Sequence, residues 1–265
     1  MSDKSAIEWT DATWNPITGC TKISPGCKNC YAETFAERFR GVPGHPFEQG
    51  FDMKFWSERL RLPAQWKEPR MIFVNSMSDL FHKDVPDEFI DQVFRAMEDA
   101  KHHTFQILTK RSSRFLIWAR ERFCKSTERV QGKRPWPSHV WAGVSVETQE
   151  YVWRIKDLVQ VPANVRFLSV EPLLGPVELD APVLKGIHWV IVGGESGPGA
   201  RPMKPEWVYS VREQCRSCGV KFFFKQWGAH TADGRRVGKK VAGRLLDGRT
   251  WDDMPVTTSG RCARD

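Results

Sequence analysis

Short runs of apolar residues alternate along this chain with longer segments in which apolar residues recur at helical spacing. The strand-like runs lie at 14–18, 71–74, 104–108, 140–144, 165–170, 187–192 and 220–224. The helix-like segments lie at 29–40, 86–101, 111–123, 148–160 and 205–218. This alternation, without a shift in composition between the two halves, predicts one α/β unit with a mainly parallel sheet.

Polar residues directly follow each strand-like run. They include Asn75, Ser76 and Asp79; Lys110 and Arg111; Ser145 and Glu147; Ser169 and Glu171; Glu195 and Ser196; and Lys225 and Gln226. In a parallel (β/α) barrel the carboxyl ends of all strands share one face, where such enzymes assemble their sites. A doubly wound open sheet would also gather these residues, but no glycine-rich nucleotide-binding loop follows the first strand. We therefore predict a single TIM-type (β/α) barrel of about seven strands that need not be fully closed.

Two irregular segments interrupt this pattern. Residues 41–70 carry several prolines and glycines, and residues 125–138 carry several arginines and lysines, so both are expected to be basic loop insertions. The barrel with these insertions is expected to span residues 1–228. The remaining residues, 229–265, are basic and glycine-rich and are expected to form a small hairpin followed by a tail.

Three cysteines, Cys20, Cys27 and Cys30, stand where the first strand leads into the first helix. Three thiolates are one ligand short of a closed tetrahedral site, so one metal position would stay open for a substrate or cofactor. A zinc site completed by His102, His103 or Cys124 is an alternative, and buried thiols are another.

A second cysteine pair, Cys215 and Cys218, has the spacing of one helical face. Its helix is expected to end at the rim of the barrel opposite the three cysteines. We therefore expect core thiols or a local redox pair here, rather than ligands of the main metal site.

The charge balance favours a polyanionic partner. Forty Lys and Arg against 32 Asp and Glu give a net charge of +8, and twelve tryptophans offer stacking surfaces for bases. The polar N-terminus and the absence of a long apolar run predict a cytoplasmic protein without a membrane partner. We expect nucleic acid to contact Lys54, Trp56, Arg59, Lys110, Arg111, Arg134 and Trp136.

Four charged residues at the predicted strand ends are candidate catalytic groups: Asp79, Glu171, Glu195 and Lys225. Each carboxylate could equally cap a strand end or pair with a cation. Their expected location on one face of the barrel favours contact with substrate or cofactor.

Several longer segments resemble a family of phage and bacterial proteins known for a three-cysteine motif. They are Trp14-Asn-Pro-Ile-Thr-Gly-Cys20, Asn75-Ser-Met-Ser-Asp79-Leu-Phe81, Leu108-Thr-Lys-Arg111, Ser169-Val-Glu171-Pro-Leu-Leu-Gly175, Gly193-Gly-Glu195-Ser-Gly and Lys225-Gln-Trp227-Gly. Cysteines between the first strand and helix of a barrel also resemble the radical S-adenosylmethionine superfamily. Within it, spore photoproduct lyase, which splits a thymine dimer in DNA, is distantly similar.

The resemblance implies a 4Fe-4S cluster on Cys20, Cys27 and Cys30, with S-adenosylmethionine at the fourth iron. It also implies that Gly193, Gly194, Glu195 and Ser169 bind the cofactor. Three features depart from the superfamily pattern. The spacing is Cys-x6-Cys-x2-Cys instead of Cys-x3-Cys-x2-Cys, Tyr31 follows the last cysteine, and the Gly-Gly-Glu run follows a late strand.

The expected function is therefore that of a lyase-type iron-sulfur enzyme that repairs a DNA photolesion by splitting a pyrimidine dimer through electron transfer. The reaction would resemble that of spore photoproduct lyase or of a photolyase, and the sequence leaves open whether a flavin or deazaflavin binds. One alternative is a radical S-adenosylmethionine enzyme that modifies RNA or protein. Another is a non-enzymatic zinc or iron-sulfur module that binds nucleic acid.

Overall fold

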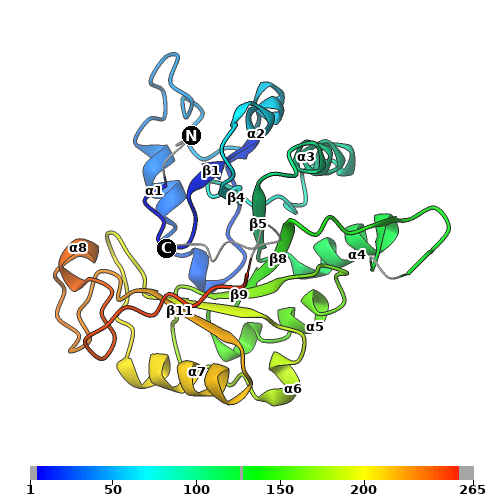
Figure 1. The fold of residues 1–265 in the computed structure, drawn as a ribbon. Helices are drawn as coiled ribbons and strands as arrows, with labels where there is room; N and C mark the ends of the chain where they lie inside the picture. Colours follow the sequence, from blue (N-terminus) through cyan, green and yellow to red (C-terminus); the bar gives the residue numbers. More distant parts are fainter. Residues whose placement is uncertain (1–4, 126–127, 257–265) are drawn as a thin grey trace. The chain divides into compact units, whose positions relative to one another are not determined.

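The computed structural model describes residues 5–125 and 128–256, which form two units (Figure 1). Unit 1 comprises residues 5–23, Cys30–Ala142 and Pro162–Asn164. Unit 2 comprises Ser24–Asn29, Gly143–Val161 and residues 165–256. The predicted tail at 257–265 and residues 126–127 of the predicted insertion lie outside the described residues.

Unit 1 is built on parallel strands. β1 (Ala12–Trp14) pairs with β4 (Met71–Val74), and β4 pairs with β5 (Thr104–Thr109), both in parallel. All four residues of β4 are buried. Such a continuous apolar strand is typical of a parallel sheet covered on both faces.

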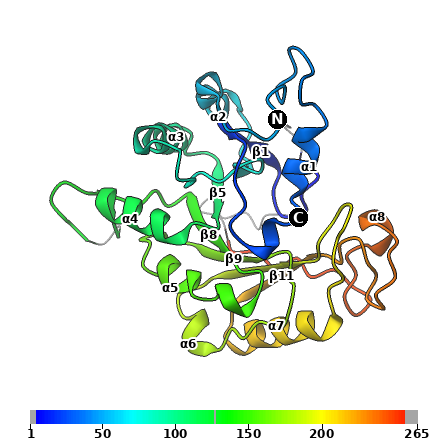
Figure 2. The ribbon, with the colours of Figure 1, turned by 180° about the vertical axis from the view of Figure 1, so that it is seen from behind.

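Three helices of unit 1 lie within predicted helical segments: α1 (Tyr31–Glu37), α3 (Asp87–Asp99) and α4 (Ser112–Arg122). α2 (Leu62–Gln65) and a 3-10 helix at Ser57–Arg61 lie in the segment 41–70, which was expected to be a loop insertion. α2 and α3 lie side by side in both views (Figures 1 and 2). α3 buries Phe89, Ile90, Val93, Phe94 and Met97 on one face, at the spacing of an amphipathic helix.

Two short ribbons stand apart from the main sheet. β2 (Ile17–Thr18) pairs antiparallel with β3 (Lys54–Phe55), and β6 (Phe123–Cys124) pairs in parallel with β7 (Arg134–Pro135). The first ribbon joins the predicted insertion at 41–70 to the residues just before Cys20. A side chain at Gly19, where φ is +90°, would meet the Asp52 carbonyl oxygen at 2.4 Å, so the insertion packs tightly there.

Unit 2 contains the later strands. β10 (Trp189–Gly193) pairs in parallel with β9 (Arg166–Val170) on one side and β11 (Lys221–Gln226) on the other. Its helices are α5 (Arg154–Leu158), α6 (Ala181–Leu184), α7 (Pro205–Ser217) and α8 (Lys239–Ala242), with 3-10 helices at Pro25–Cys27 and Gln149–Tyr151. α7 packs against β11 and against α6 (Figure 1).

The main sheet has seven strands in the order β1-β4-β5-β8-β9-β10-β11, where β8 is Val140–Ser145. The sheet therefore has the predicted number of strands, and neighbouring strands follow one another in sequence order. In the described part of the chain this order has two ends, β1 and β11, so the sheet is not a closed barrel. No helix among the described residues is long and apolar enough to cross a membrane.

A buried histidine makes the stability of unit 1 depend on pH. His103 is 1% exposed, and its Nδ1 accepts a hydrogen bond from the Arg70 backbone N–H at 3.1 Å while its Nε2 lies 2.9 Å from the Pro63 carbonyl oxygen. This geometry requires the neutral ring, since a proton on Nδ1 would break the bond from Arg70. Burial lowers the pKa of His103 from 6.5 to about 4.

The unfolded chain therefore takes up a proton at His103 before the folded chain does. The stabilisation is complete above pH 6.5 and is lost as the pH falls toward 4, by about 2 kcal/mol between pH 7 and pH 5. We expect His103→Gln to remove this part of the pH dependence in denaturant titrations at the two pH values. The partly exposed His45, which stacks on Phe39, gives the control His45→Gln. An equal pH dependence in wild type and His103→Gln would contradict this account.

Candidate functional site

The cysteine-bearing segment is a loop with little regular structure. Cys20 follows β2, Cys27 ends a 3-10 turn, and Cys30 is the N-cap residue of α1. All three thiols are partly exposed and none is in a disulfide. Residues 24–29 of the loop belong to unit 2, and the rest of the loop belongs to unit 1.

In unit 1, Arg111 contacts the first part of the loop. Its Nη1 donates to the Asp79 carboxylate at 3.0 Å and lies 3.5 Å from Cys20 Sγ. Its Nη2 donates to the carbonyl oxygen of Thr21 at 3.0 Å and to the Thr21 hydroxyl at 3.2 Å. The guanidinium thus fixes Thr21 and places a positive charge beside the Cys20 sulfur.

Asp79 has no vacant acceptor position for a substrate. One carboxylate oxygen accepts hydrogen bonds from the Phe81 N–H and the Thr109 hydroxyl, and the other accepts from the Lys110 N–H and Arg111. The residue is 6% exposed. In the structure this candidate catalytic residue ties the residues after β4 to those after β5.

His82 adds to the same group of residues. It is 1% exposed, and its Nε2 lies 2.7 Å from the Thr21 hydroxyl. Burial and the neighbouring Arg111 lower the pKa of His82, so the ring is neutral near pH 7. Thr21 is therefore held from two sides, by His82 and by Arg111.

In unit 2, Glu147 contacts the middle of the loop at Ser24 and Gly26. Its carboxylate accepts from the Ser24 hydroxyl at 2.7 Å and pairs with Arg154 at 2.8 Å, and both charged side chains are at most 1% exposed. A side chain at Gly26 would meet Glu147 Cγ at 2.5 Å. Only glycine therefore allows the loop to approach this buried carboxylate.

Glu195 holds the other end of this part of the loop. Its carboxylate accepts from the Asn29 side chain at 3.0 Å and from the Arg201 backbone and guanidinium at 2.8 Å. Arg201 also donates to the Pro25 carbonyl oxygen at 2.9 Å. Burial alone would raise the pKa of Glu195, but the hydrogen bonds from Arg201 and Asn29 outweigh it and lower the pKa.

Of the predicted cofactor residues, Gly193 and Gly194 directly precede Glu195, whereas Ser169 pairs with Ile191 between β9 and β10. Gly194 donates its N–H to the Gln226 carbonyl oxygen, and a side chain on it would come within 2.0 Å of the Trp227 carbonyl oxygen. Ser169 is 3% exposed within β9. Gly193 packs against Glu171, where a side chain would lie 3.1 Å from the carboxylate. The glycines thus serve close packing between strand ends, and both Glu195 oxygens have partners within the protein.

Glu171 and Lys225 form the remaining ion pair at the strand ends. Lys225 Nζ lies 2.6 Å from Glu171 Oε1, which also accepts from the Gln226 amide at 3.3 Å. The side chains are 13% and 19% exposed, for Lys225 and Glu171 respectively. Unlike Asp79 and Glu195, this pair has solvent access and makes no contact that would hold the cysteine loop among the described residues.

The predicted nucleic-acid contacts fall into different environments. Lys54 and Arg59 both lie over the Trp56 ring, at 4.0 and 3.7 Å, and Trp56 Nε1 donates to the Thr18 hydroxyl at 2.9 Å. Trp136 is only 2% exposed and packs against Phe94 and Phe123, so its side chain does not face solvent as the sequence suggested.

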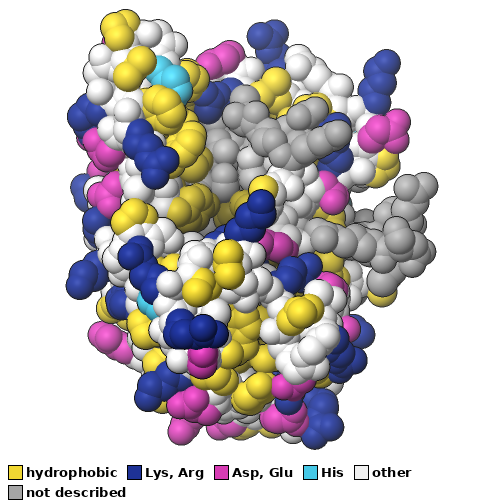
Figure 3. Space-filling view, turned by 90° about the vertical axis from the view of Figure 1, so that its left-hand side faces the viewer, with side chains coloured by type: hydrophobic (Ala, Val, Ile, Leu, Met, Phe, Trp, Pro, Cys, Tyr) yellow, Lys and Arg dark blue, Asp and Glu magenta, His cyan; other side chains and the backbone are white. Residues whose placement is uncertain are grey.

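The other basic candidates are partly engaged within the protein. Arg134 pairs with Glu98 at 3.2 Å and lies over the Phe123 ring, whereas the Lys110 backbone N–H is bonded to Asp79. On the face drawn in Figure 3, Lys and Arg side chains are spread among hydrophobic and acidic ones.

The residues considered for a zinc site are engaged elsewhere. His103 is bonded to Arg70 and Pro63, His102 Nε2 lies 2.6 Å from the Trp66 carbonyl oxygen, and Cys124 donates to the Glu128 carbonyl oxygen. Over residues 5–125 and 128–256, no three His, Cys, Asp or Glu side chains converge to hold one metal ion. Cys215, near the end of α7, is fully buried, and burial raises its pKa to about 12, as expected for a core thiol.

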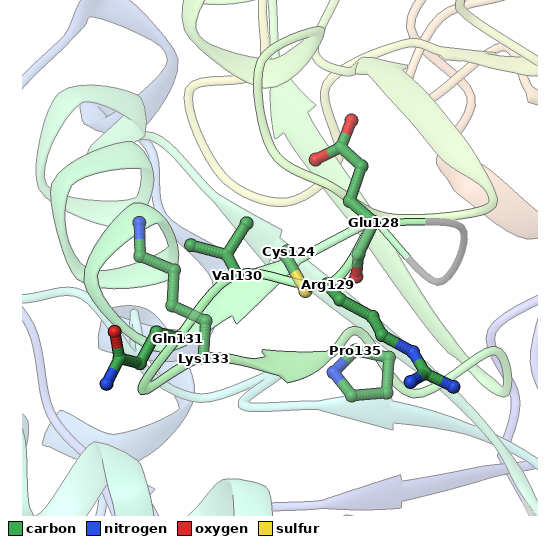
Figure 4. A pocket seen from close by; sticks show the side chains of 7 residues that line it. All are labelled: Cys124, Glu128, Arg129, Val130, Gln131, Lys133 and Pro135. Atoms are coloured by element: carbon green, nitrogen blue, oxygen red, sulfur yellow. Dashed lines mark hydrogen bonds between the residues drawn. The ribbon is translucent and has the colours of Figure 1, made fainter.

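A separate pocket of about 370 Å³ lies beside the β6–β7 ribbon (Figure 4). It is lined by Cys124, Glu128, Arg129, Val130, Gln131, Lys133 and Pro135. None of these residues is among the candidate catalytic or cofactor residues. The pocket therefore belongs to the second insertion and not to the strand ends.

Sequence reasoning missed the partners that hold the cysteine loop: Ser24, Asn29, Glu147, Arg154 and Arg201. Glu147 was visible as a polar residue after a strand. Arg154 carried a weaker signal, because an arginine on the buried face of a short helix needs a partner. Nothing in the local sequence singles out Arg201.

The donor set suits an iron-sulfur cluster better than a single ion. In such a cluster each thiolate bonds a different iron, so the thiols need not converge on one point. The three cysteines are partly exposed, lack disulfides and follow one another within eleven residues, with a guanidinium beside the first. Thiolates of cysteine are the usual ligands of iron-sulfur clusters.

Comparisons with known proteins give a family but no activity. The model of a family described as "Protein of unknown function (DUF5131)" matches residues 4–255. A search of curated proteins finds no match. One solved structure, titled "Spore photoproduct lyase complexed with dinucleoside spore photoproduct", aligns with 75% of this chain at 12% identity and a TM-score of 0.40. The alignment covers 58% of that protein, so this chain spans less than two thirds of its length.

Proposed function

We propose that this chain, which belongs to the DUF5131 family, is an iron-sulfur enzyme that acts on nucleic acid. Cys20, Cys27 and Cys30 would hold a four-iron cluster with one open iron. The observation that carries the proposal is the fixation of the cysteine loop. Ion pairs centred on Asp79, Glu147 and Glu195 hold the residues between and beside the cysteines, while the thiols themselves stay partly exposed.

Holding the loop with buried ion pairs costs desolvation free energy. Desolvating the Glu147–Arg154 pair costs several kcal/mol per ion, which its attraction offsets only in good geometry. A loop that only connected β2 to α1 would not need a buried ion pair bonded to it. A metal centre does need them, because partners in the outer shell orient the ligands and tune the metal.

The four candidate catalytic residues then divide into two pairs by their contacts. Asp79 and Glu195 are positioning residues, since their oxygens are bonded to groups that hold the cysteine loop. Glu171 and Lys225 remain available for substrate. Glu171 orients the Lys225 ammonium, which can donate a hydrogen bond or a proton to a substrate oxygen. The cluster, when bound, would supply a single electron to substrate or to S-adenosylmethionine.

The nucleic-acid part of the proposal rests on charge and on the first insertion. The net charge is +8, which favours a polyanion. Lys54 and Arg59 flank Trp56, and β3 pairs with β2 only two residues before Cys20. Phosphate contacts from these cations would therefore bring the backbone of a nucleic acid close to the cysteine loop.

The specific substrate we propose is a pyrimidine photolesion in DNA. This choice follows the motif resemblance to radical enzymes described above. A crosslinked pyrimidine pair stacks poorly, so it can be turned out of the duplex at low cost to reach a protein site. An electron added to the dimer would weaken the bonds that join the two bases, and after these bonds break the electron would return from the base radical anion to the oxidised donor. The splitting is therefore redox-neutral overall and needs no hydrolytic machinery.

The test uses anaerobically purified full-length protein and an ultraviolet-irradiated thymine oligonucleotide. The mixture is reduced with dithionite, with and without S-adenosylmethionine, and separately illuminated; the bases are quantified by liquid chromatography and mass spectrometry. We expect loss of photoproduct and recovery of thymine with the wild type and not with Cys27→Ala. No binding and no change of irradiated DNA under any of these conditions would contradict the DNA repair proposal.

Two other outcomes point to the alternative functions. Cleavage of S-adenosylmethionine without preference for damaged DNA would indicate a radical enzyme that modifies RNA or protein. Nucleic-acid binding without iron would indicate a binding module. Either result would replace the repair proposal.

A further inference from the structure

Arg111 is a charged side chain that contacts a cysteine of the loop, Cys20. It is the N-cap residue of α4 and lies two residues after the end of β5 at Thr109. Its Nη1 lies 3.5 Å from Cys20 Sγ and 3.0 Å from the Asp79 carboxylate. Its side chain is 12% exposed, so little water screens its charge.

Hydrogen bonds hold both terminal nitrogens of this guanidinium. Asp79 accepts from Nη1, and the Thr21 carbonyl and hydroxyl oxygens accept from Nη2. Asp79 is itself held by Thr109 and by backbone N–H groups. The positive charge therefore cannot move away from Cys20 without breaking several hydrogen bonds.

The contact described for the Cys27 thiol is of a different kind. Within unit 2 its sulfur lies 3.6 Å from the Ser24 hydroxyl, which is neutral. The cation beside Cys20 therefore distinguishes Cys20 from Cys27. Hydrogen bonds and charge near a ligand sulfur are among the factors that set the reduction potential of an iron-sulfur cluster.

We infer that Arg111 raises the reduction potential of the cluster that binds at Cys20, through a charge-assisted hydrogen bond to the thiolate. This rests on the proposed function. Reduction adds one electron from an external reductant, here dithionite, and one negative charge to the cluster. A fixed guanidinium favours this more negative state, so Arg111 is a positioning and tuning residue whose effect appears in the potential and not only in activity.

The test is a redox titration of anaerobically purified protein with dithionite and mediator dyes, followed by absorption and electron paramagnetic resonance. We expect Arg111→Gln to shift the midpoint to more negative potential by about a tenfold change in the reduction equilibrium, which is about 59 mV for one electron. Arg111→Lys keeps the charge but cannot bond Asp79 and Thr21 together, so an intermediate shift is expected. Arg122→Gln is the control. Arg122 lies on the same helix and pairs with Asp91 at 2.6 Å, and none of its contacts among the described residues involves a cysteine.

The outcomes separate this inference from the proposed function. A wild-type protein without iron would overturn both. Iron in the wild type with unchanged potentials in Arg111→Gln and Arg111→Lys would overturn only the role of Arg111. If Arg111→Gln fails to retain iron, Arg111→Lys decides: a negative shift supports the inference, and an unchanged potential contradicts it.

Discussion

Replacement of Arg154 by methionine is expected to lower the free energy of unfolding by about 3–5 kcal/mol. Arg154 pairs with Glu147 at 2.8 Å, and the two side chains are 1% and 0% exposed. Methionine fills much of the space but leaves the Glu147 carboxylate buried without its cation. Arg154 also donates to the Ser145 carbonyl oxygen, so this hydrogen bond is lost as well.

The measurement is chemical denaturation of wild type and variant at pH 7. Arg216→Met provides the control, because the Arg216–Glu213 pair lies on the surface of α7, with side chains 79% and 45% exposed. Its loss should cost less than about 1 kcal/mol. Glu147→Gln with Arg154→Met should recover part of the loss, since the amide removes the unpaired charge. Equal effects of Arg154→Met and Arg216→Met would show that the buried pair does not stabilise unit 2.

Alanine at Cys27 is expected to abolish iron binding and to reduce any cluster-dependent activity at least about 100-fold. Changes to outer-shell partners already cost 10- to 100-fold in metal sites, and Cys27 would be a direct ligand. Two remaining thiolates would leave two irons without protein ligands. The fold should persist, because Cys27 is partly exposed and its contact with Ser24 is the single hydrogen bond described for its thiol.

Iron and acid-labile sulfide are measured after anaerobic purification, and circular dichroism checks the fold. Cys218→Ala is the matched control, since Cys218 is also partly exposed and follows α7 outside the loop. It should keep the iron content of the wild type. Retention of full iron by Cys27→Ala would remove Cys27 from the ligand set.

Local sequence patterns predicted the elements well, because burial in a parallel sheet leaves a local signature. The run at 71–74 coincides with β4, and the helix expected at 205–218 differs from α7 by one residue. The segment at 148–160 was less regular than expected. Its apolar spacing marked the buried residues Ile155 and Leu158, but the chain forms a 3-10 turn before α5, which apolar spacing alone does not reveal.

Barrel closure and side-chain burial depend on contacts distant in sequence. The sequence pattern therefore does not decide closure, and it did not predict the burial of Trp136. Closure would need β1 and β11 to pair, which no local period specifies. Trp136 follows a basic stretch and therefore suggested a surface contact. Its burial is decided by Phe94 and Phe123, the first of which lies about forty residues away in the sequence.

In the candidate site, too, the sequence indicated the residues but not their partners. The polar residues at the strand ends were visible in sequence, but their roles depend on their partners. Asp79 and Glu195 could each have faced a substrate, and the arginines at 111 and 201 bond them to the cysteine loop instead. Glu171 and Lys225 pair with each other, which a separation of 54 residues in the sequence did not indicate.

Metal analysis of the anaerobically purified wild-type protein shows whether the cysteine loop holds an iron-sulfur cluster. Iron, acid-labile sulfide and zinc are determined per chain, together with the absorption spectrum in the thiolate-to-iron region. If the cysteine loop holds a four-iron cluster, we expect about four iron and four sulfide per chain with that absorption band, and little zinc. Stoichiometric zinc, or no metal together with no absorption after reconstitution with iron and sulfide, would contradict it.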